Sequence, residues 1–232
     1  HARQHPEDGR AGRVEANVVE HQSRPRQGGG GHQPKGRAGN IPRHGEIHGL
    51  GNLSPLERGA NFDESAVFRG VFVFPNGLIE YYDKRKLFTL SGEQQHFASG
   101  KKETIISYLG WNINLQICYD LRFPELCRNH IIDEKPAYDL LLYVANWPEK
   151  RIEHWTTLLK ARAIENQAYV IGANRIGLDG KDLFYSGGSS ICDPNGNTME
   201  LKIESNEIQS VILSIEDLNI IRGNLPFLKD QD

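Results

Sequence analysis

The chain has 232 residues, of which 38% are hydrophobic and 25% are charged, and its formal net charge is −3. This length suits one sizeable globular domain, and the near-neutral charge balance gives no electrostatic footprint for nucleic acid or for an anionic membrane surface. No apolar run approaches the roughly 18 residues of a membrane-spanning helix and no secretory signal peptide is visible, so we expect a cytoplasmic protein with no nucleic-acid or membrane partner.

The first 66 residues differ in amino-acid composition from the rest of the chain. Six of the nine histidines fall there, and the first aromatic residue is Phe62. Residues 24–45, "RPRQGGGGHQPKGRAGNIPRHG", combine Arg, Gly, Gln and Pro without an apolar period. Such a composition buries too little surface to offset its ordering entropy. We therefore expect residues 1–66 to be a disordered or non-native leader and residues 67–232 to form the folded domain, with the scattered histidines solvated.

From Val67 onward, the strand signals are clear. Two β-rich runs flank Pro-Asn-Gly at residues 75–77, which predicts a hairpin. Residues 111–117 alternate in the manner of a strand, with Ile113, Leu115 and Ile117 on one face. The apolar run at residues 137–148, "AYDLLLYVANWP", is typical of a buried strand that ends before a proline.

Helical spacing follows this run. In residues 151–167 the apolar side chains recur at helical intervals, at Ile152, Trp155, Leu158, Leu159 and Ala163. A further strand is predicted at residues 168–177, a hairpin through Asn195-Gly196, and a last strand at 208–215 before a short helix. Because strand and helix material alternates with hairpins interspersed, we predict a layered α/β sandwich built on a mixed sheet.

The three cysteines, at positions 118, 127 and 192, are an odd number at uneven spacing. A disulfide framework is therefore not expected, and reduced thiols in a cytosol fit better. No Cys-x-x-Cys pair occurs, and the histidines are expected to be solvated, so we expect no metal site.

Cys118 comes directly after the predicted strand. A cysteine in that position is most often a small buried hydrophobe. Polar and charged residues crowd after it, however, and the carboxyl end of a strand in an α/β sheet is where ligands collect. A nucleophilic thiol also needs a nearby cation or base. Lys84, Lys86 and Glu93 are candidates, although a lysine-rich run is also typical of a solvated surface.

Cysteine–histidine catalysis is disfavoured. His154 is the only histidine after residue 130, and it falls within the predicted helix. An elbow of the glutamine-amidotransferase kind would place glycines beside the cysteine, whereas Ile117 and Tyr119 stand there.

From about Phe68 to the C-terminus the chain resembles the nitrilase superfamily of carbon-nitrogen hydrolases, and most closely its ω-amidase branch of YafV type. The matching pieces are "YYDKRKLF", "GEQQHF", "CYDLRFPELCRN", "YVANWPEKR", "HWTTLLKARAIENQAYVIGANRIG", "YSGGSSICDPNG" and "LPFLKD". They follow the order of that family over roughly 165 residues. The resemblance implies an αββα sandwich, here missing or altered at its N-terminal strand and helix.

The resemblance also implies roles for individual residues. Cys118 would be the nucleophile that forms a thioester. Lys84 would stabilise the oxyanion, with Lys86 as the competing candidate, and Glu93 would support the lysine. The backbone N–H of Tyr119 would be a second oxyanion donor.

Two further positions follow from the same resemblance. Arg122 would hold a substrate carboxylate, a task that suits a bidentate guanidinium. Trp147 would wall the pocket, and it fits a core aromatic equally well.

One expected feature of the family has no match. Its general base is a glutamate after an early strand, and nothing in residues 1–66 resembles that motif. Glu46, Glu57 and Glu64 are carboxylates in this region, but none follows an apolar strand.

The implied function is a thiol amidohydrolase that acts on a small carboxylate-bearing amide such as 2-oxoglutaramate or 2-oxosuccinamate, without metal or organic cofactor. The alternatives are a nitrilase-like binding module that lacks its base, or a nitrilase or carbamoylase of the same superfamily. A homodimer is also expected, with the helix after Cys118 and the helix at residues 152–166 as candidate interface elements.

Overall fold

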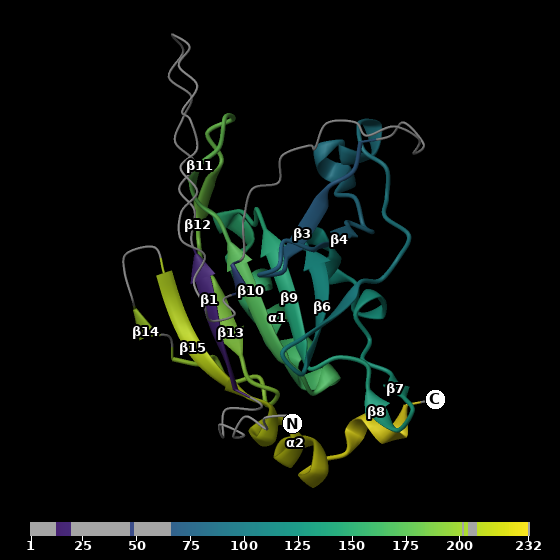
Figure 1. Ribbon diagram of the computed structural model, residues 1–232. Coiled ribbons are helices and arrows are strands. Elements are labelled where there is room, and N and C mark those ends of the chain that lie inside the picture. Colours follow the sequence, from purple (N-terminus) through teal and green to yellow (C-terminus); the bar gives the residue numbers. More distant parts are fainter. Residues whose placement is uncertain (1–12, 20–46, 49–65, 201, 204–207, 232) are drawn as a thin grey trace.

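The computed structural model describes residues 13–19, 47–48, 66–200, 202–203 and 208–231 (Figure 1). Its centre is a five-stranded mixed sheet in the order β13 (Ser190–Cys192), β10 (Tyr169–Asn174), β9 (Leu140–Ala145), β6 (Trp111–Ile117) and β5 (Ile105–Tyr108). The three central strands run parallel, and both edge strands run antiparallel to their neighbours. The predicted mixed sheet is confirmed. Since parallel strands end at the same edge, the residues after β6, β9 and β10 gather there.

The central strands alternate between two buried faces. In β9, Leu140 and Leu142 belong to one apolar cluster, whereas Leu141, Tyr143 and Ala145 belong to the other. Strands covered on both faces read as continuous apolar runs rather than as a polar–apolar alternation. This explains the unbroken "LLLYVA" of β9.

One face of this sheet is covered by α1 (Ile152–Asn166), as the apolar spacing predicts. Trp155 and Leu159 are fully buried against the strands. Gly172 of β10 permits the close approach, because a Cβ there would lie 2.5 Å from Leu159 Cδ1 and 2.7 Å from Trp155 Cζ2.

The other face packs against a second β layer. It consists of a four-stranded sheet in the order β14 (Lys202–Ile203), β15 (Ile208–Ser214), β1 (Arg13–Val19) and β2 (Ile47–His48), together with the hairpin β3 (Arg69–Val73) and β4 (Ile79–Asp83). Phe72, Tyr82 and Leu213 from this layer share one core with Ile113 and Ile171 of the central sheet. The molecule is thus a sandwich of helix, sheet and sheet.

The hairpin at residues 75–77 and the turn through Asn195-Gly196 are both confirmed. Gly77 has φ +85° and Gly196 has φ +81°, a region open to glycine at no steric cost. β3 pairs antiparallel with β4, and Cys192 bridges to Thr198 across the second turn.

The C-terminal helix α2 (Ile215–Asn224) follows β15 directly and lies at the lower end of the sheets in Figure 1. Its Leu218 is buried in the core between the sheets. Arg222 reaches back to the start of the parallel strands, where it donates to Asp139 Oδ1 at 2.8 Å, to Tyr138 O at 2.8 Å and to Gln167 O at 2.8 Å. α2 therefore fastens the amino ends of β9 and β10.

The remaining elements are short. They are the 3-10 helices η1 (Thr89–Ser91), η2 (Glu93–Gln95), η3 (Cys118–Arg122), η4 (Pro124–Leu126), η5 (Glu149–Arg151) and η6 (Phe227–Asp230), and the two-stranded pairs β7 (Ile131–Ile132) with β8 (Lys135–Pro136) and β11 (Ile176–Leu178) with β12 (Phe184–Ser186). The expected helix after Cys118 is therefore corrected to two 3-10 turns, since Pro124 lacks the N–H that would continue a helix.

Within residues 1–66 the structure describes only β1 and β2. β1 pairs antiparallel with β15 and parallel with β2, so these nine residues belong to the second β layer. The other leader residues lie outside the described part, and their predicted disorder stays a prediction. Among the described residues, no helix is both long and apolar enough to cross a membrane.

Candidate active site

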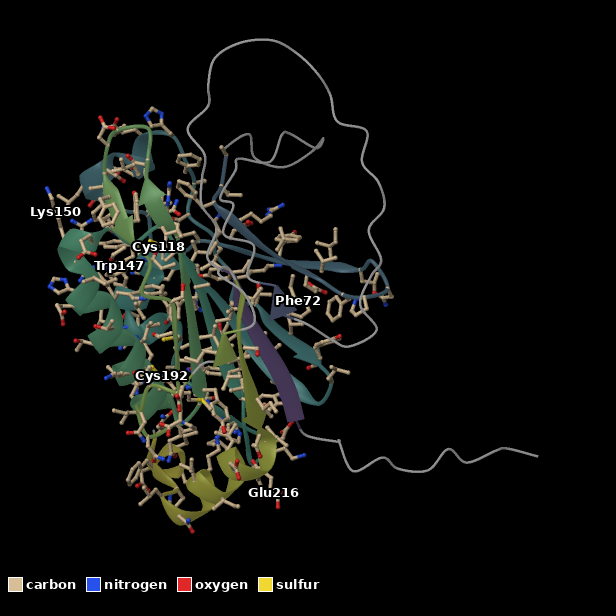
Figure 2. All side chains as sticks on the ribbon, turned by 90° about the vertical axis from the view of Figure 1, so that its left-hand side faces the viewer. Phe72, Cys118, Trp147, Lys150, Cys192 and Glu216 are labelled. Carbon is tan, nitrogen blue, oxygen red and sulfur yellow. The ribbon has the colours of Figure 1, made fainter. Side chains whose placement is uncertain are left out.

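Cys118 lies at the carboxyl end of β6, as the first residue of η3 (Figure 2). Its backbone has φ +46°, an uncommon conformation for a residue other than glycine. The side chain is half-buried between the two apolar clusters, and Sγ lies 3.7 Å from the carbonyl oxygen of Asn146, just after β9. The sharp turn thus places the thiol at the shared carboxyl edge of the parallel strands.

Lys84 and Glu93 form a close ion pair next to this edge. Lys84 follows β4 and is only 3% exposed, and its Nζ donates to Glu93 Oε2 at 2.6 Å. The same carboxylate oxygen accepts from the Phe88 N–H at 2.7 Å, which fixes its direction. Lys86 points elsewhere, with 39% of its side chain exposed and Nζ 3.6 Å from Glu125 Oε1. Lys84 is therefore the buried lysine of the two, and Lys86 is the more exposed one.

The electrostatic surroundings of Cys118 act in opposite directions. Burial raises the pKa of its thiol, and the charge of Lys84 lowers it. The carboxylates of Glu93 and Asp120 raise it further. The charge of Lys84 therefore favours the thiolate, while burial, the larger effect, opposes it.

Asp120 is a site residue that the sequence analysis did not single out for a role. Its carboxylate is fully buried and accepts three hydrogen bonds, from the N–H of Lys86 at 2.8 Å, the hydroxyl of Tyr82 at 2.9 Å and the N–H of Ile117 at 3.1 Å. The available signal was an acidic residue two positions after the cysteine, between apolar neighbours. A buried carboxylate is stable only with such partners.

Arg122 and Trp147 lie together. The guanidinium of Arg122 sits 4.7 Å from the centre of the Trp147 ring, and its Nη2 lies 3.1 Å from Nδ1 of His154. Trp147 is 3% exposed, so its alternative interpretation as a core aromatic also holds.

Asn174, at the end of β10, holds Trp147 in place. Its Oδ1 accepts from the Trp147 N–H at 2.7 Å, and its Nδ2 donates to the Trp147 carbonyl at 2.9 Å. In the sequence, Asn174 is a polar residue at the end of a buried strand, and this pattern alone assigns it no role.

Tyr119 is half-buried beside Cys118, with its ring 4.9 Å from that of Phe88 and 5.2 Å from that of Phe123. Two cations stack on these neighbours, Arg151 at 5.6 Å from the Phe88 ring and Lys86 at 4.7 Å from the Phe123 ring. Tyr119 is thus surrounded by aromatic rings, and two cations lie on those rings.

Tyr185 is a further residue whose charge is linked to that of the thiol, and no pattern in the sequence singles it out. Burial raises its pKa to about 12, and Cys118 contributes to that rise. Its hydroxyl donates to Asp179 Oδ2 at 3.1 Å, and Arg175 stacks on its ring at 4.5 Å.

The carboxylates considered as general base, Glu46, Glu57 and Glu64, lie outside the described residues. Within the described ranges, no group of three or more His, Cys, Asp or Glu side chains could hold a metal ion.

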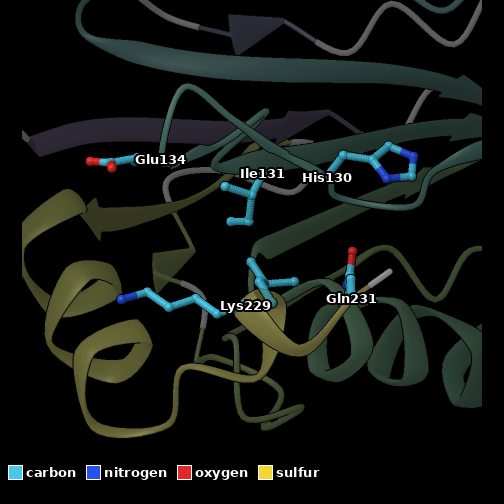
Figure 3. A pocket seen from close by; sticks show the side chains of 6 residues that line it. His130, Ile131, Glu134, Lys229 and Gln231 are labelled. Atoms are coloured by element: carbon cyan, nitrogen blue, oxygen red, sulfur yellow. The ribbon is translucent and has the colours of Figure 1, made fainter.

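A separate polar hollow lies near α2 and the C-terminal turn η6, and Figure 3 shows it from close by. Its lining residues are His130, Ile131, Glu134, Leu228, Lys229 and Gln231. None of the predicted site residues lines it.

Comparison with known proteins places these observations in context. The profile of the carbon-nitrogen hydrolase family matches residues 50–218. The omega-amidase YafV of Yersinia enterocolitica is 45% identical over 176 residues, which cover 74% of this chain and 66% of that protein. A 2-oxoglutaramate amidase of Paenarthrobacter nicotinovorans is 41% identical over 117 residues, covering 50% of this chain and 38% of its own length.

Solved structures agree in fold. A CN-hydrolase superfamily protein from Xanthomonas campestris, whose crystal structure has an arsenic adduct in the active site, superposes with a TM-score of 0.72 at 36% identity, covering 81% of this chain and 69% of that one. The Saccharomyces cerevisiae protein Nit3 of the nitrilase superfamily gives a TM-score of 0.63 at 23% identity, with 79% and 65% coverage. The chain spans between 50% and 66% of the length of the omega-amidases it matches.

Proposed function

The chain belongs to the carbon-nitrogen hydrolase family, and from this premise we propose that it is an amidohydrolase of the ω-amidase type with Cys118 as its nucleophile. The observation that carries the proposal is the buried Lys84–Glu93 ion pair acting on a thiol at the carboxyl edge of parallel strands. A structural core cysteine would have no need of a buried cation beside it.

The reaction would proceed in two stages. The Cys118 thiolate attacks the amide carbon, and the tetrahedral intermediate collapses as the C–N bond breaks. The nitrogen takes up a proton and leaves as ammonia, which leaves a thioester on the sulfur. Water then attacks the thioester carbon, the C–S bond breaks, and the acid product departs while the thiol is regenerated.

Two donors would stabilise the oxyanion of each tetrahedral intermediate. One is the Lys84 ammonium, held by Glu93. The other is the backbone N–H of Tyr119, the second residue of η3. The first N–H groups of a helical turn have no carbonyl partner within that turn, so they are available to an anion.

The cations near Cys118 support a substrate that carries a carboxylate. Arg122, stacked on Trp147, presents a planar donor pair that suits a carboxylate. Relatives of this chain are named omega-amidase and 2-oxoglutaramate amidase. We therefore propose 2-oxo acid amides such as 2-oxoglutaramate and 2-oxosuccinamate as substrates, and no metal or organic cofactor takes part in this scheme.

A second candidate is a binding module that retains the fold without turnover. It is favoured by one observation: the two carboxylates that act on Cys118, Glu93 and Asp120, are both engaged in hydrogen bonds. Such a module would keep a reactive thiol and release no ammonia.

The test is ammonia release from 2-oxoglutaramate, 2-oxosuccinamate, glutamine, a simple nitrile and an N-carbamoyl amine, for the parent chain and for Cys118→Ala. We expect release from the 2-oxo acid amides alone, and its loss in Cys118→Ala. Release from the nitrile or from the N-carbamoyl amine would instead identify the chain as a nitrilase or a carbamoylase of the same superfamily. No release from any compound, with Cys118 still alkylated by iodoacetamide, would favour the binding module.

We also propose a cytoplasmic homodimer. All three cysteines are free, which suits a reducing compartment. The outward side of α1 carries Ile164 with 51% exposure, which supports α1 as an interface element. Sedimentation equilibrium of the parent chain and of Ile164→Asp tests this, and a monomeric parent would contradict it.

A further inference from the structure

The carboxylate of Asp120 joins the two segments that carry the proposed nucleophile and its lysine. Oδ1 accepts from the Lys86 N–H, and Oδ2 accepts from the Tyr82 hydroxyl and the Ile117 N–H. Tyr82 and Lys86 flank Lys84 by two residues on either side, and Ile117 directly precedes Cys118. One buried group therefore spans both segments.

The turn at Cys118 needs such a clamp. A non-glycine residue at positive φ costs on the order of 1 kcal/mol and persists only where its surroundings hold it. The bond from the Ile117 N–H to Oδ2 of Asp120 closes a short loop around Cys118 and fixes the backbone on both sides of it.

The charge of Asp120 gives no help to the chemistry. A carboxylate next to the sulfur raises the thiol pKa and so opposes the thiolate, as Glu93 does, whereas Lys84 favours it. Asp120 is also fully buried, and both its oxygens accept hydrogen bonds from the protein, so its carboxylate is not exposed to solvent. What it contributes is geometric.

We propose that Asp120 is a positioning residue that sets the register between Cys118 Sγ and Lys84 Nζ by tying η3 to the end of β4. The proposal rests on the proposed function for its catalytic meaning, while the register itself can be measured without turnover. The readout is the coupling between the lysine charge and the thiol.

The first experiment is a double-mutant cycle on thiol reactivity. The rate of iodoacetamide alkylation is followed against pH for the parent chain, Lys84→Met, Asp120→Asn and the double variant, with Cys118→Ala giving the background from Cys127 and Cys192. Lys84→Met should shift the alkylation profile to higher pH in the parent. In the Asp120→Asn background the same change should produce less than half that shift. An equal shift in both backgrounds overturns the proposal.

The second experiment uses turnover. Asp120→Asn keeps the shape but presents an amide NH₂ to N–H donors, so at least one of the three bonds is lost. We expect kcat to fall by about 10- to 100-fold with little change in KM, because the lost register affects the reacting atoms rather than the binding of substrate. A fall in kcat at unchanged KM, together with the lost coupling between Lys84 and the thiol, is the signature of lost register. Unchanged kcat would contradict it.

A matched control separates register from stability. Asp139 is a buried carboxylate at the other end of the sheet, where it accepts from Arg222 and from the Asn112 N–H. Asp139→Asn should lower the thermal midpoint as Asp120→Asn does, while kcat per folded molecule stays at the parent value. If the parent itself releases no ammonia, the proposed function fails, and the alkylation cycle alone decides the role of Asp120.

Discussion

At Cys118, burial and a single buried cation compete for control of one thiol. Burial raises its pKa above the ordinary value near 9, and Lys84 offsets only part of that rise. The reactive thiolate should therefore accumulate only at alkaline pH in the free protein. A substrate that brings its own charge and displaces water would alter this balance during turnover.

This balance predicts the pH dependence of alkylation. Because the folded pKa of Cys118 is raised, the iodoacetamide rate should rise over a higher pH range than that of an ordinary exposed thiol, which is half ionised near pH 9. Rates measured from pH 6 to 11 on the parent and on a small thiol check the prediction. A plateau below pH 8 for the parent would contradict it.

Lys84 and Lys86 give a second prediction at the same scale. Lys84→Met should lower kcat for a 2-oxo acid amide by about 100-fold or more, since one oxyanion donor is lost. Lys86→Met removes an equal charge from an exposed side chain. It should change kcat less than 3-fold, because the ion pair of Lys86 with Glu125 is a weak surface contact. Steady-state kinetics of both variants decides, and a reversed order would assign the role to Lys86.

The sequence pointed to individual groups rather than to their connections. A resemblance of short motifs pointed to Cys118, Lys84 and Glu93; the structure pairs Lys84 with Glu93, and the charges of both affect the pKa of the Cys118 thiol. Asp120 and Asn174 were not assigned roles. Their importance lies in backbone groups that are distant in the sequence: the Lys86 N–H is 34 positions from Asp120, and the Trp147 N–H is 27 positions from Asn174.

At the scale of elements, the contact between α1 and the central sheet depends on Gly172. Gly172→Ala should destabilise the protein by about 1–3 kcal/mol, because the added methyl overlaps Leu159 and Trp155 of a helix that cannot shift without opening the core. Gly180→Ala, in a loop with open space around the glycine, is the matched control and should be nearly neutral. Urea unfolding of both variants measures the difference, and equal stability would refute the packing argument.

Elements with a clear period were predictable from the sequence. The central strands, the hairpin at residues 75–77 and α1 appear where alternation, turn residues and helical spacing place them. The segment after Cys118 was not, because "CYDLRFPEL" has apolar residues at near-helical intervals. Pro124 and the positive φ of Cys118 divide it into two short turns.

The whole molecule should lose stability at high pH. Burial raises the pKa of Cys127 and of Cys192 from about 9 in the unfolded chain to about 11 in the folded one. Between these values the native state retains protons that the unfolded state releases, so the free energy of unfolding falls as pH rises from 9 to 11.

Urea unfolding at pH 8 and pH 10 tests this expectation. Each thiol should contribute on the order of 1 kcal/mol to the loss, and Cys127→Ala should reduce the pH dependence even though it lowers stability at both pH values. A free energy of unfolding that does not change between pH 8 and pH 10 would contradict the prediction.

At this largest scale the layered α/β architecture was predictable, since it follows from the alternation of elements. The strand β1 was not predicted, because its residues precede the first aromatic of the chain and lie next to residues 24–45, which lack an apolar period. Its place in the sheet comes from pairing with β15, whose residues lie nearly 200 positions later in the sequence.

Arg222 has a consequence for the order in which the chain acquires its structure. Its guanidinium satisfies Asp139 and two carbonyls that lie 83, 84 and 55 positions earlier. During synthesis from the N-terminus, the parallel strands emerge well before the residue that neutralises this buried carboxylate. The central sheet should thus remain loosely closed on the ribosome and close fully only after α2 has left the exit tunnel.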